Sequence, residues 1–388
     1  MNTLASLEEE LLDMWRQVLE VEDLGTGEKF TDRGGTPELG GRLIEMLEKR
    51  FELILHLPWL VAAPTIHDQA QWLLYRCFPG PPPEEVADPR QWREAFAQRF
   101  PDVAEAAPGP PLPPVVFVLC AARTGSTLLR IMLAGHSQLF CPPEPELLLF
   151  RDMQSRRKGL MDGWSDFKGL EKALMELRGL DEAGAQRATE QMLRENRSTY
   201  SVYAHIQELC SPRILLEKAT SYPLSIPALK RAEAWFERPK YIHLVRHPLA
   251  CIRSWTDCNF DQVVYGPPRQ AGEMDWLLSN ENILDHLSRV EPERQTFIRY
   301  EDLLNNPESE MRRLCAFLQL EFQQSVLQPY AGERMTGRLS GLVSGDKKFY
   351  GKSAIDASAL RGARRLPEDG PITEETRTLA TRLGYEEL

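Results

Sequence analysis

Apolar positions recur with two different periods along the chain. Over residues 4–20 leucine, tryptophan and valine recur every three or four positions, and this spacing predicts a helix with one buried face. Two further stretches, which open at Thr36 and Pro64, continue the helical pattern. From Pro113 onward short uncharged runs alternate with longer helical stretches. Such alternation is typical of an α/β fold in which helices flank a parallel sheet.

Proline-rich sequence separates the two patterns. Pro-Gly-Pro-Pro-Pro and Pro-Gly-Pro-Pro-Leu-Pro-Pro flank a helical piece around Trp92 to Phe100. Proline at this density blocks helix and sheet and favours a semi-rigid extended chain. We therefore expect a small all-α helical bundle over residues 1–78, a Pro-rich linker with a short helix over residues 79–112, and an α/β domain over residues 113–388.

The first predicted strand, Val115 to Leu119, leads into a loop with the chemistry of an anion site. The strand is β-branched and uncharged, which favours burial on both faces. Between this strand and the next helix, residues 121–127 must turn the chain, so that backbone N–H groups and a helix N-terminus point at one spot. Arg123 adds a positive charge there. The other candidate ligands are small or hydroxyl-bearing residues of the same loop: Thr124, Gly125, Ser126 and Thr127.

A Walker-type NTPase loop is the nearest alternative for this stretch. That loop needs a glycine five residues before Gly125 and a lysine directly after it, whereas this chain has Cys120 and Ser126. We therefore expect a loop that holds a nucleotide phosphate without positioning a γ-phosphate and magnesium for hydrolysis. An ordinary turn with a capping serine remains open on this stretch alone.

A second candidate anion site follows a later predicted strand, Tyr241 to Val245. Arg246 comes directly after this strand, and Ser254 comes eight residues later on a helix that Pro248 begins. A guanidinium group offers a planar fork of donors, so Arg246 and the Ser254 hydroxyl can converge on one phosphate. A solvated or ion-paired arginine is the alternative.

Taken together, these motifs resemble those of sulfotransferases that use 3′-phosphoadenosine 5′-phosphosulfate (PAPS). Arg-Thr-Gly-Ser-Thr-Leu-Leu-Arg resembles the family's loop for the 5′-phosphosulfate, with Ala122 where proline is usual, and Arg246 and Ser254 match its motif for the 3′-phosphate. The segment around Lys218 resembles a further family motif after a middle strand. The resemblance implies a P-loop-like sulfotransferase domain, PAPS as co-substrate, adenosine 3′,5′-bisphosphate as product, and no metal.

Two later stretches agree with this resemblance less specifically, and an earlier stretch has a separate interpretation. Lys347 and Lys348 lie where the family carries a basic loop that folds over the nucleotide, and solvent-facing charges are the alternative. Ile298-Arg-Tyr-Glu-Asp resembles the element that closes the family's sheet, with a structural role. Residues 167–195 read as a helical insertion, which is a candidate for part of a substrate lid.

Transfer of a sulfuryl group to an alcohol needs a base for the hydroxyl and positive charge at the leaving oxygen. The resemblance places the base at Glu144, with Glu146 as the alternative. The sulfotransferases of olefin-forming polyketide synthases, the nearest resemblance, tend to carry histidine at the position of Glu146. Lys218 and Arg123 are the candidates for stabilising the developing charge, and we expect His136 to orient the loop helix.

The first segment resembles an acyl or peptidyl carrier protein. It shares a Leu-x-x-x-Trp helix, Phe30-x-Asp-x-Gly-Gly before the second helix, and Pro64-Thr-Ile before the last. In the carrier family the two glycines precede a serine that carries phosphopantetheine, whereas this chain has Thr36, Pro37 and Glu38. Proline has no hydroxyl group, so the resemblance implies a carrier-like domain without its prosthetic arm.

The amino-acid composition limits which classes of binding partner and which cellular compartment are expected for the protein. The 388 residues are enough for two or three domains. A net charge of −11 argues against nucleic acid as the main partner. Seven cysteines without a CxxC pair suit a reducing cytosol better than disulfides or a zinc site. No apolar run approaches the ~18 residues of a membrane span, and the acidic N-terminus lacks the features of a signal peptide. We expect a soluble, cytoplasmic protein.

The resemblance implies a PAPS-dependent sulfotransferase. The expected acceptor is the β-hydroxyl of a carrier-bound acyl chain in polyketide or olefin biosynthesis, with polyketide synthase modules as partners. Sulfation of a free small-molecule or peptide hydroxyl is an alternative. A nucleotide-binding assembly factor without turnover is another.

Overall fold

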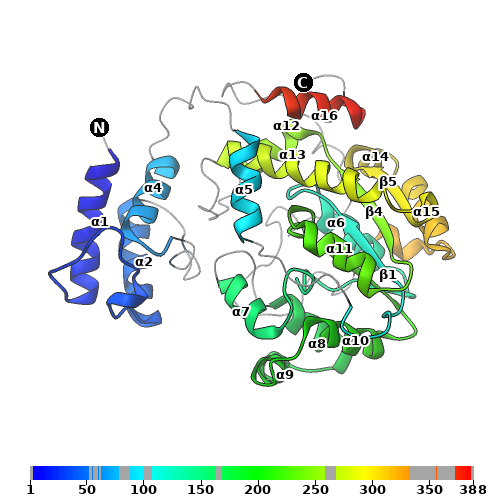
Figure 1. Cartoon of the computed structure of the whole chain (residues 1–388), viewed down its shortest axis with the longest axis horizontal. Helices are drawn as coiled ribbons and strands as arrows, with labels where there is room; N and C mark the ends of the chain where they lie inside the picture. The colour runs from blue at the N-terminus through cyan, green and yellow to red at the C-terminus, as the bar shows by residue number, and fades with distance from the viewer. Residues whose placement is uncertain are drawn as a thin grey trace.

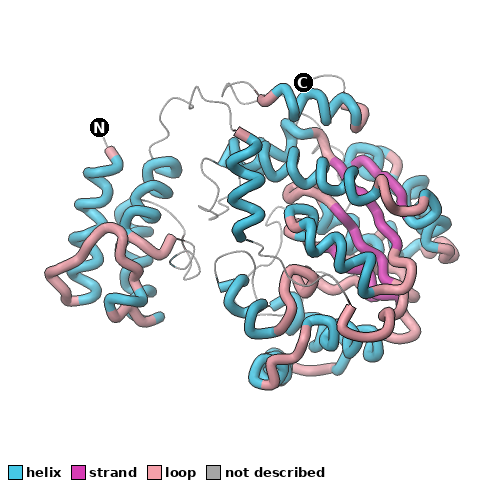
Figure 2. Tube along the Cα trace, in the orientation of Figure 1, coloured by secondary structure: helices cyan, strands magenta, loops and turns pink. Residues whose placement is uncertain are grey.

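The computed structural model describes residues 3–51, 55, 60, 63–77, 88–99, 107–161, 168–257, 268–331, 355 and 372–385. Figure 1 shows a group of N-terminal helices and a larger body that mixes helices with strands. In Figure 2 the strands of the described residues all lie in this larger body. All of the described strands therefore come after Pro113 in the chain.

The N-terminal helices form a bundle around Trp15. The indole is fully buried, packs edge-on against Phe30 at 5.0 Å between ring centroids, and donates from Nε1 to Gln69 Oε1 at 2.9 Å. Apolar residues from every helix surround it, which confirms the predicted buried faces. The bundle consists of α1 (Leu4–Leu19), the 3-10 turn η1 (Thr31–Arg33), α2 (Pro37–Phe51) and α4 (Ile66–Cys77).

Within the described residues, five parallel strands form one sheet in the order β2-β3-β1-β4-β5. The chain leaves the central strand β1 toward β2 on one side and leaves β4 toward β5 on the other. The carboxyl ends of β1 and β4 therefore flank a switch point, which is where ligands bind in sheets of this kind. The strands are β1 (Val115–Leu119), β2 (Leu139–Phe140), β3 (Ile214–Lys218), β4 (Lys240–Val245) and β5 (Gln295–Arg299).

Helices cover both faces of the sheet, so the body has three layers. Alternate side chains of β1 enter two separate apolar cores, Phe117 on one face and Val118 on the other. The Phe117 core includes α10 (Thr199–Cys210), α11 (Ile226–Trp235) and α13 (Pro268–Leu287); the Val118 core includes α6 (Ser126–Leu133) and α15 (Pro307–Leu318). Burial on both faces explains why β1 is apolar at every position.

Several of the remaining helices were predicted from the sequence. The predicted insertion over residues 167–195 contains α8 and α9, and the short helix predicted in the linker is α5. Arg93 of α5 pairs with Glu281 of α13 at 2.5 Å between Nη2 and Oε2. These helices are α5 (Pro89–Arg99), α7 (Met153–Met161), α8 (Lys168–Arg178), α9 (Glu182–Arg194), α12 (Pro248–Asp257), α14 (Tyr300–Asn305) and α16 (Glu374–Arg382).

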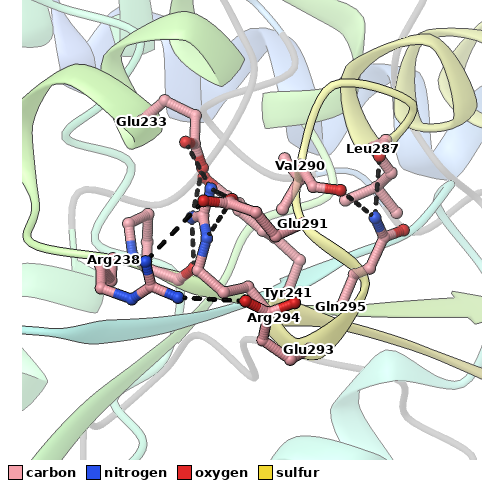
Figure 3. Close-up of polar contacts among 10 residues, drawn as sticks. Glu233, Arg238, Tyr241, Leu287, Val290, Glu291, Glu293, Arg294 and Gln295 are labelled. Carbon is pink, nitrogen blue, oxygen red and sulfur yellow. Dashed lines mark hydrogen bonds and ion pairs between the residues drawn. The ribbon is translucent and has the colours of Figure 1, made fainter.

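An ion-pair network fastens the amino end of the sheet (Figure 3). Arg294, just before β5, donates to both carboxylate oxygens of Glu233 on α11, each at 3.0 Å, and to the Pro239 carbonyl at 2.9 Å. The Tyr241 hydroxyl of β4 donates to the same Glu233 at 2.6 Å, and Glu291 accepts from Arg294 Nε at 2.7 Å. The network joins α11, β4 and β5 at the amino ends of the strands. The anion loops, which are the loop of residues 121–127 after β1 and the loop that begins with Arg246 after β4, lie at the opposite, carboxyl edge of the sheet.

Candidate active site

The loop after β1 turns sharply at two residues. Arg123 has φ of +62° and Gly125 has φ of +83°, both in the left-handed region. A Cβ atom added at Gly125 would lie 2.1 Å from Tyr300 Cε2, so no larger residue fits there. Gly125 is the N-cap of α6, and the first turn of this helix directs N–H groups to the carboxyl edge. The turn therefore brings a helix N-terminus and the Arg123 charge together.

Two buried contacts hold this loop from inside the protein. The Asp275 carboxylate of α13 accepts a hydrogen bond from the Ala122 N–H at 2.7 Å. The Thr124 hydroxyl donates to the Ala121 carbonyl at 2.9 Å. Burial raises the pKa of Asp275 to about 7. Thr124, expected from the sequence to bind the anion, thus closes the turn with its side chain.

The loop after β4 lies directly against the loop after β1. Arg246 donates from Nη1 to the Arg123 carbonyl at 3.0 Å, and its guanidinium lies over the Tyr300 ring at 4.8 Å from the centroid. Ser254 Oγ accepts from Arg123 Nε at 3.1 Å. The Trp276 indole donates to the Arg246 carbonyl at 2.9 Å. The two anion motifs predicted separately from the sequence therefore meet at one place.

Lys218, the last residue of β3, brings a further charge to the same edge. It lies beside Val118 of β1, and its Nζ contacts Glu144 Oε1. The Lys218 side chain is 4% exposed, whereas that of Glu144 is 31% exposed. Burial lowers the pKa of Lys218 to about 7, and nearby Arg123 contributes to this shift.

Glu146 faces the interior. It is 2% exposed and has φ of +49°. Its Oε1 accepts from Ser221 Oγ at 3.3 Å, and the buried Arg156 guanidinium provides the opposing charge. Arg156 is itself held by the Pro145 carbonyl at 2.9 Å from Nε. The geometry separates the two candidate bases, because only Glu144 keeps a substantial part of its carboxylate accessible to a substrate.

A buried network that sequence reasoning missed holds the segment with both glutamates. The Tyr222 hydroxyl donates to Glu217 and accepts from the Leu147 N–H at 3.0 Å. Tyr203 donates to the other Glu217 oxygen at 2.5 Å. Burial raises the pKa of Glu217 to about 7. The available signal was a glutamate inside an otherwise apolar strand, directly before Lys218.

Two residues directly after β5 also belong to the site. The sequence predicts a structural role for this element, but Tyr300 contacts both Gly125 and Arg246. The Glu301 carboxylate accepts from the His247 N–H at 3.0 Å and from the Tyr385 hydroxyl at 2.9 Å. Their position at the carboxyl end of a parallel strand was the sequence signal for a functional contact.

Other predicted residues lie apart from this cluster. His136 lies beside the Glu321 carbonyl at 2.8 Å from Nε2, and its Nδ1 accepts from the Gln138 N–H at 3.1 Å, in agreement with an orienting role. Lys347 and Lys348 lie outside the described residues. Within the described ranges there is no group of three or more His, Cys, Asp or Glu side chains placed to hold a metal. None of the described helices combines the length and apolarity needed to cross a membrane.

Comparisons with known proteins agree with this geometry. A family model described as "Sulfotransferase family" matches residues 114–324. The solved sulfotransferase domain from the curacin biosynthetic pathway is 40% identical, with a TM-score of 0.68, and the alignment covers 72% of this chain and all of that domain. The sulfotransferase domain of the Synechococcus PCC 7002 olefin synthase is 35% identical, with a TM-score of 0.65, and the coverage is 74% and 98%.

A more distant curated relative is the nodulation protein NoeE of Sinorhizobium fredii. It is 24% identical over 303 residues, which are 71% of this chain and 67% of that protein. The family match covers more than half of the chain and includes the two anion loops, Lys218 and Glu144. This chain therefore belongs to the sulfotransferase family.

Proposed function

We propose that the chain transfers a sulfuryl group from PAPS to a hydroxyl group of a carrier-bound acyl chain. The contact between the two anion loops carries this proposal. Arg123 hydrogen-bonds Ser254, and Arg246 hydrogen-bonds the Arg123 carbonyl. Two phosphate groups of one nucleotide need donors that are close together and differently oriented. The β1 loop suits the 5′-phosphosulfate, and Arg246 with Ser254 suits the 3′-phosphate.

In this proposal the acceptor oxygen attacks the sulfur atom, and the bond from sulfur to the bridging oxygen of the 5′-phosphate breaks. The bonding electrons remain on that phosphate oxygen, which leaves as adenosine 3′,5′-bisphosphate. Glu144 takes the proton of the acceptor hydroxyl. Lys218 and Arg123 stabilise the charge that develops on the leaving oxygen. Contact with Lys218 holds the Glu144 carboxylate in place beside the candidate leaving-group charge.

The acceptor assignment rests on two observations. The two solved domains described above come from the curacin pathway and an olefin synthase, which supports a carrier-linked β-hydroxyacyl substrate and polyketide synthase modules as partners. The insertion helix α8 packs closely against the main chain of the residue assigned as the base: a Cβ atom on Gly169 would lie 2.0 Å from the Glu144 carbonyl oxygen. We assign α8 as one wall of the acceptor site, consistent with a lid function.

Residues 1–78 make up a carrier-like domain in this proposal, residues 79–112 a linker, and residues 113–388 the catalytic domain. Gly35 supports the carrier-like turn, because Phe30 leaves no room for a Cβ atom at this glycine. The proposed role of the domain is docking, since Pro37 stands where a carrier protein has its modified serine.

Transfer of radiolabelled sulfate from PAPS tests the proposal. We expect label on a carrier-tethered β-hydroxyacyl chain and little on the same free acid. Preferential labelling of the free acid or of a peptide would replace the acceptor assignment. Nucleotide binding with no transfer to any hydroxyl would instead indicate an assembly factor.

The same assay tests the base. Glu144→Gln should lower kcat by on the order of a hundredfold, because it removes a positioned base, while the affinity for adenosine 3′,5′-bisphosphate stays unchanged. Glu146→Gln is the matched comparison, since the same change is made two residues away on a side chain that faces the interior. A variant pair in which only Glu146→Gln loses turnover would reverse the assignment.

A further inference from the structure

Two adjacent residues of α13 each hold one of the anion loops. We propose that Asp275 and Trp276 are positioning residues that fix the β1 and β4 loops at the spacing one nucleotide requires. The inference rests on the proposed nucleotide binding, and neither residue is needed to touch the nucleotide itself. Both side chains are buried, with Asp275 4% exposed and Trp276 fully buried.

Asp275 determines where the β1 loop begins its turn. Its carboxylate accepts the Ala122 N–H at 2.7 Å, directly before Arg123 enters the left-handed region at φ of +62°. The left-handed region is strained for a residue other than glycine, so this conformation persists only where its surroundings impose it. The buried bond to Ala122 supplies this constraint on the N-terminal side, and Gly125 with Tyr300 supplies it on the other.

Trp276 completes a closed series of contacts. Its indole N–H donates to the Arg246 carbonyl at 2.9 Å, while the Arg246 guanidinium donates to the Arg123 carbonyl at 3.0 Å. The series runs from Asp275 to the β1 loop, across to Arg246, and back to the next residue of the same helix. Because α13 is a single 20-residue helix packed in the core, it fixes the distance between the two loops.

The protonation of Asp275 gives this arrangement a measurable consequence, which is the uptake of protons when the nucleotide binds. The groups around Asp275 decide how its carboxyl group titrates. The titratable groups that face Asp275 are the Cys120 thiol after β1 and the Cys251 thiol of α12, and burial raises the pKa of both. The charged groups beside Cys251 include Arg123 and Arg246.

On α13 itself, Glu273 faces away, because it accepts from the Thr373 hydroxyl at 2.8 Å. Burial raises the pKa of Asp275 to about 7, so its carboxyl group exchanges a proton near neutral pH. The phosphates of a bound nucleotide add negative charge beside it and favour the protonated carboxyl group. A protonated Asp275 still accepts the Ala122 N–H through its carbonyl oxygen. Nucleotide binding should therefore take up protons through this residue.

Titration calorimetry with adenosine 3′,5′-bisphosphate on the full chain tests the inference. We expect Asp275→Ala to weaken binding about tenfold, the equivalent of one lost buried hydrogen bond and a misplaced loop, and Trp276→Phe to act in the same direction. Asp275→Asn should keep affinity within about threefold at pH 7, because an amide oxygen can replace the acceptor. The matched control is Asp285→Asn, the same change at an exposed position of α13.

Repeating the titration at pH 7 in buffers of different ionisation enthalpy measures the protons taken up. The wild type should take up more protons than Asp275→Asn, whereas a merely structural role would leave the two equal. Full affinity in Asp275→Ala, or a loss in Asp275→Asn as large as in Asp275→Ala, overturns the inference. A wild type that does not bind the nucleotide overturns the proposed function and this inference with it. Thermal melting of each variant separates unfolding from a loop effect.

Discussion

At the scale of single residues, Gly125 combines two requirements that no other amino acid meets. Its φ is +83°, and Tyr300 occupies the space of a side chain. Gly125→Ala should therefore lower the free energy of unfolding by about 1–3 kcal/mol and weaken nucleotide binding, as measured by urea denaturation and calorimetry. Gly41→Ala is the matched control. This glycine lies in α2 with open space around it, so the change should be neutral or stabilising by about 0.5–1 kcal/mol. Equal effects at the two positions would contradict the steric argument.

The same scale shows what a sequence can predict about the site. Arg123, Gly125 and Ser126 were identifiable because a strand, a turn and a helix follow one another locally. The orientations of Glu144 and Glu146 were not predictable, because they depend on φ of +49° at Glu146 and on the charge of Arg156. Both orientations depend on the tertiary structure, which the spacing of residues along the sequence does not reveal.

At the scale of elements, β3 carries a buried carboxyl group on one face and a buried ammonium group at its end. Burial moves the pKa of Glu217 from 4.5 to about 7. Because the folded protein then binds a proton more tightly than the unfolded chain, this group lowers stability as the pH rises from about 5 to 7. Glu217→Gln removes that dependence.

Urea denaturation at pH 5 and pH 8 measures the effect. The quantity to compare is the unfolding free energy of Glu217→Gln minus that of the wild type. This difference should be up to about 3 kcal/mol larger at pH 8 than at pH 5, since each pKa unit corresponds to about 1.4 kcal/mol. Glu190→Gln, on the exposed surface of α9, should show no such gain. A pH-independent difference between the wild type and Glu217→Gln would mean that the Tyr203 and Tyr222 hydrogen bonds fully offset the burial.

Elements were more predictable than their contacts. The strands predicted at Val115 to Leu119 and Tyr241 to Val245 are present, because an uncharged β-branched run has few other stable environments. The two-residue strand β2 was missed, since a run this short carries no period. The contacts of α13 were missed for a different reason: Asp275 and Trp276 lie more than 20 residues from either anion motif, and only the folded chain brings them together.

At the scale of the whole molecule, the N-terminal bundle is the part whose role depends most on one position. The Thr36 hydroxyl accepts the Leu39 N–H at 3.3 Å, so it caps α2 and is engaged in the fold. Pro37 begins α2 and has no hydroxyl. We expect no mass increase of roughly 340 Da when the protein is incubated with coenzyme A and a broad-specificity phosphopantetheinyl transferase. A shift of that mass on Thr36 or a nearby hydroxyl would make the protein a self-loading module.

The Arg294 network lies at the amino edge of the sheet, and the reaction is assigned to the carboxyl edge. Strands of five residues separate the two edges by roughly 17 Å, a distance at which mutational effects usually add. Directed evolution of a new acceptor range can therefore treat the two edges as independent. The effect of reshaping the wall near Glu144 should therefore add to the effect of a change at the amino edge, such as one at the Arg238–Glu293 pair, without altering it.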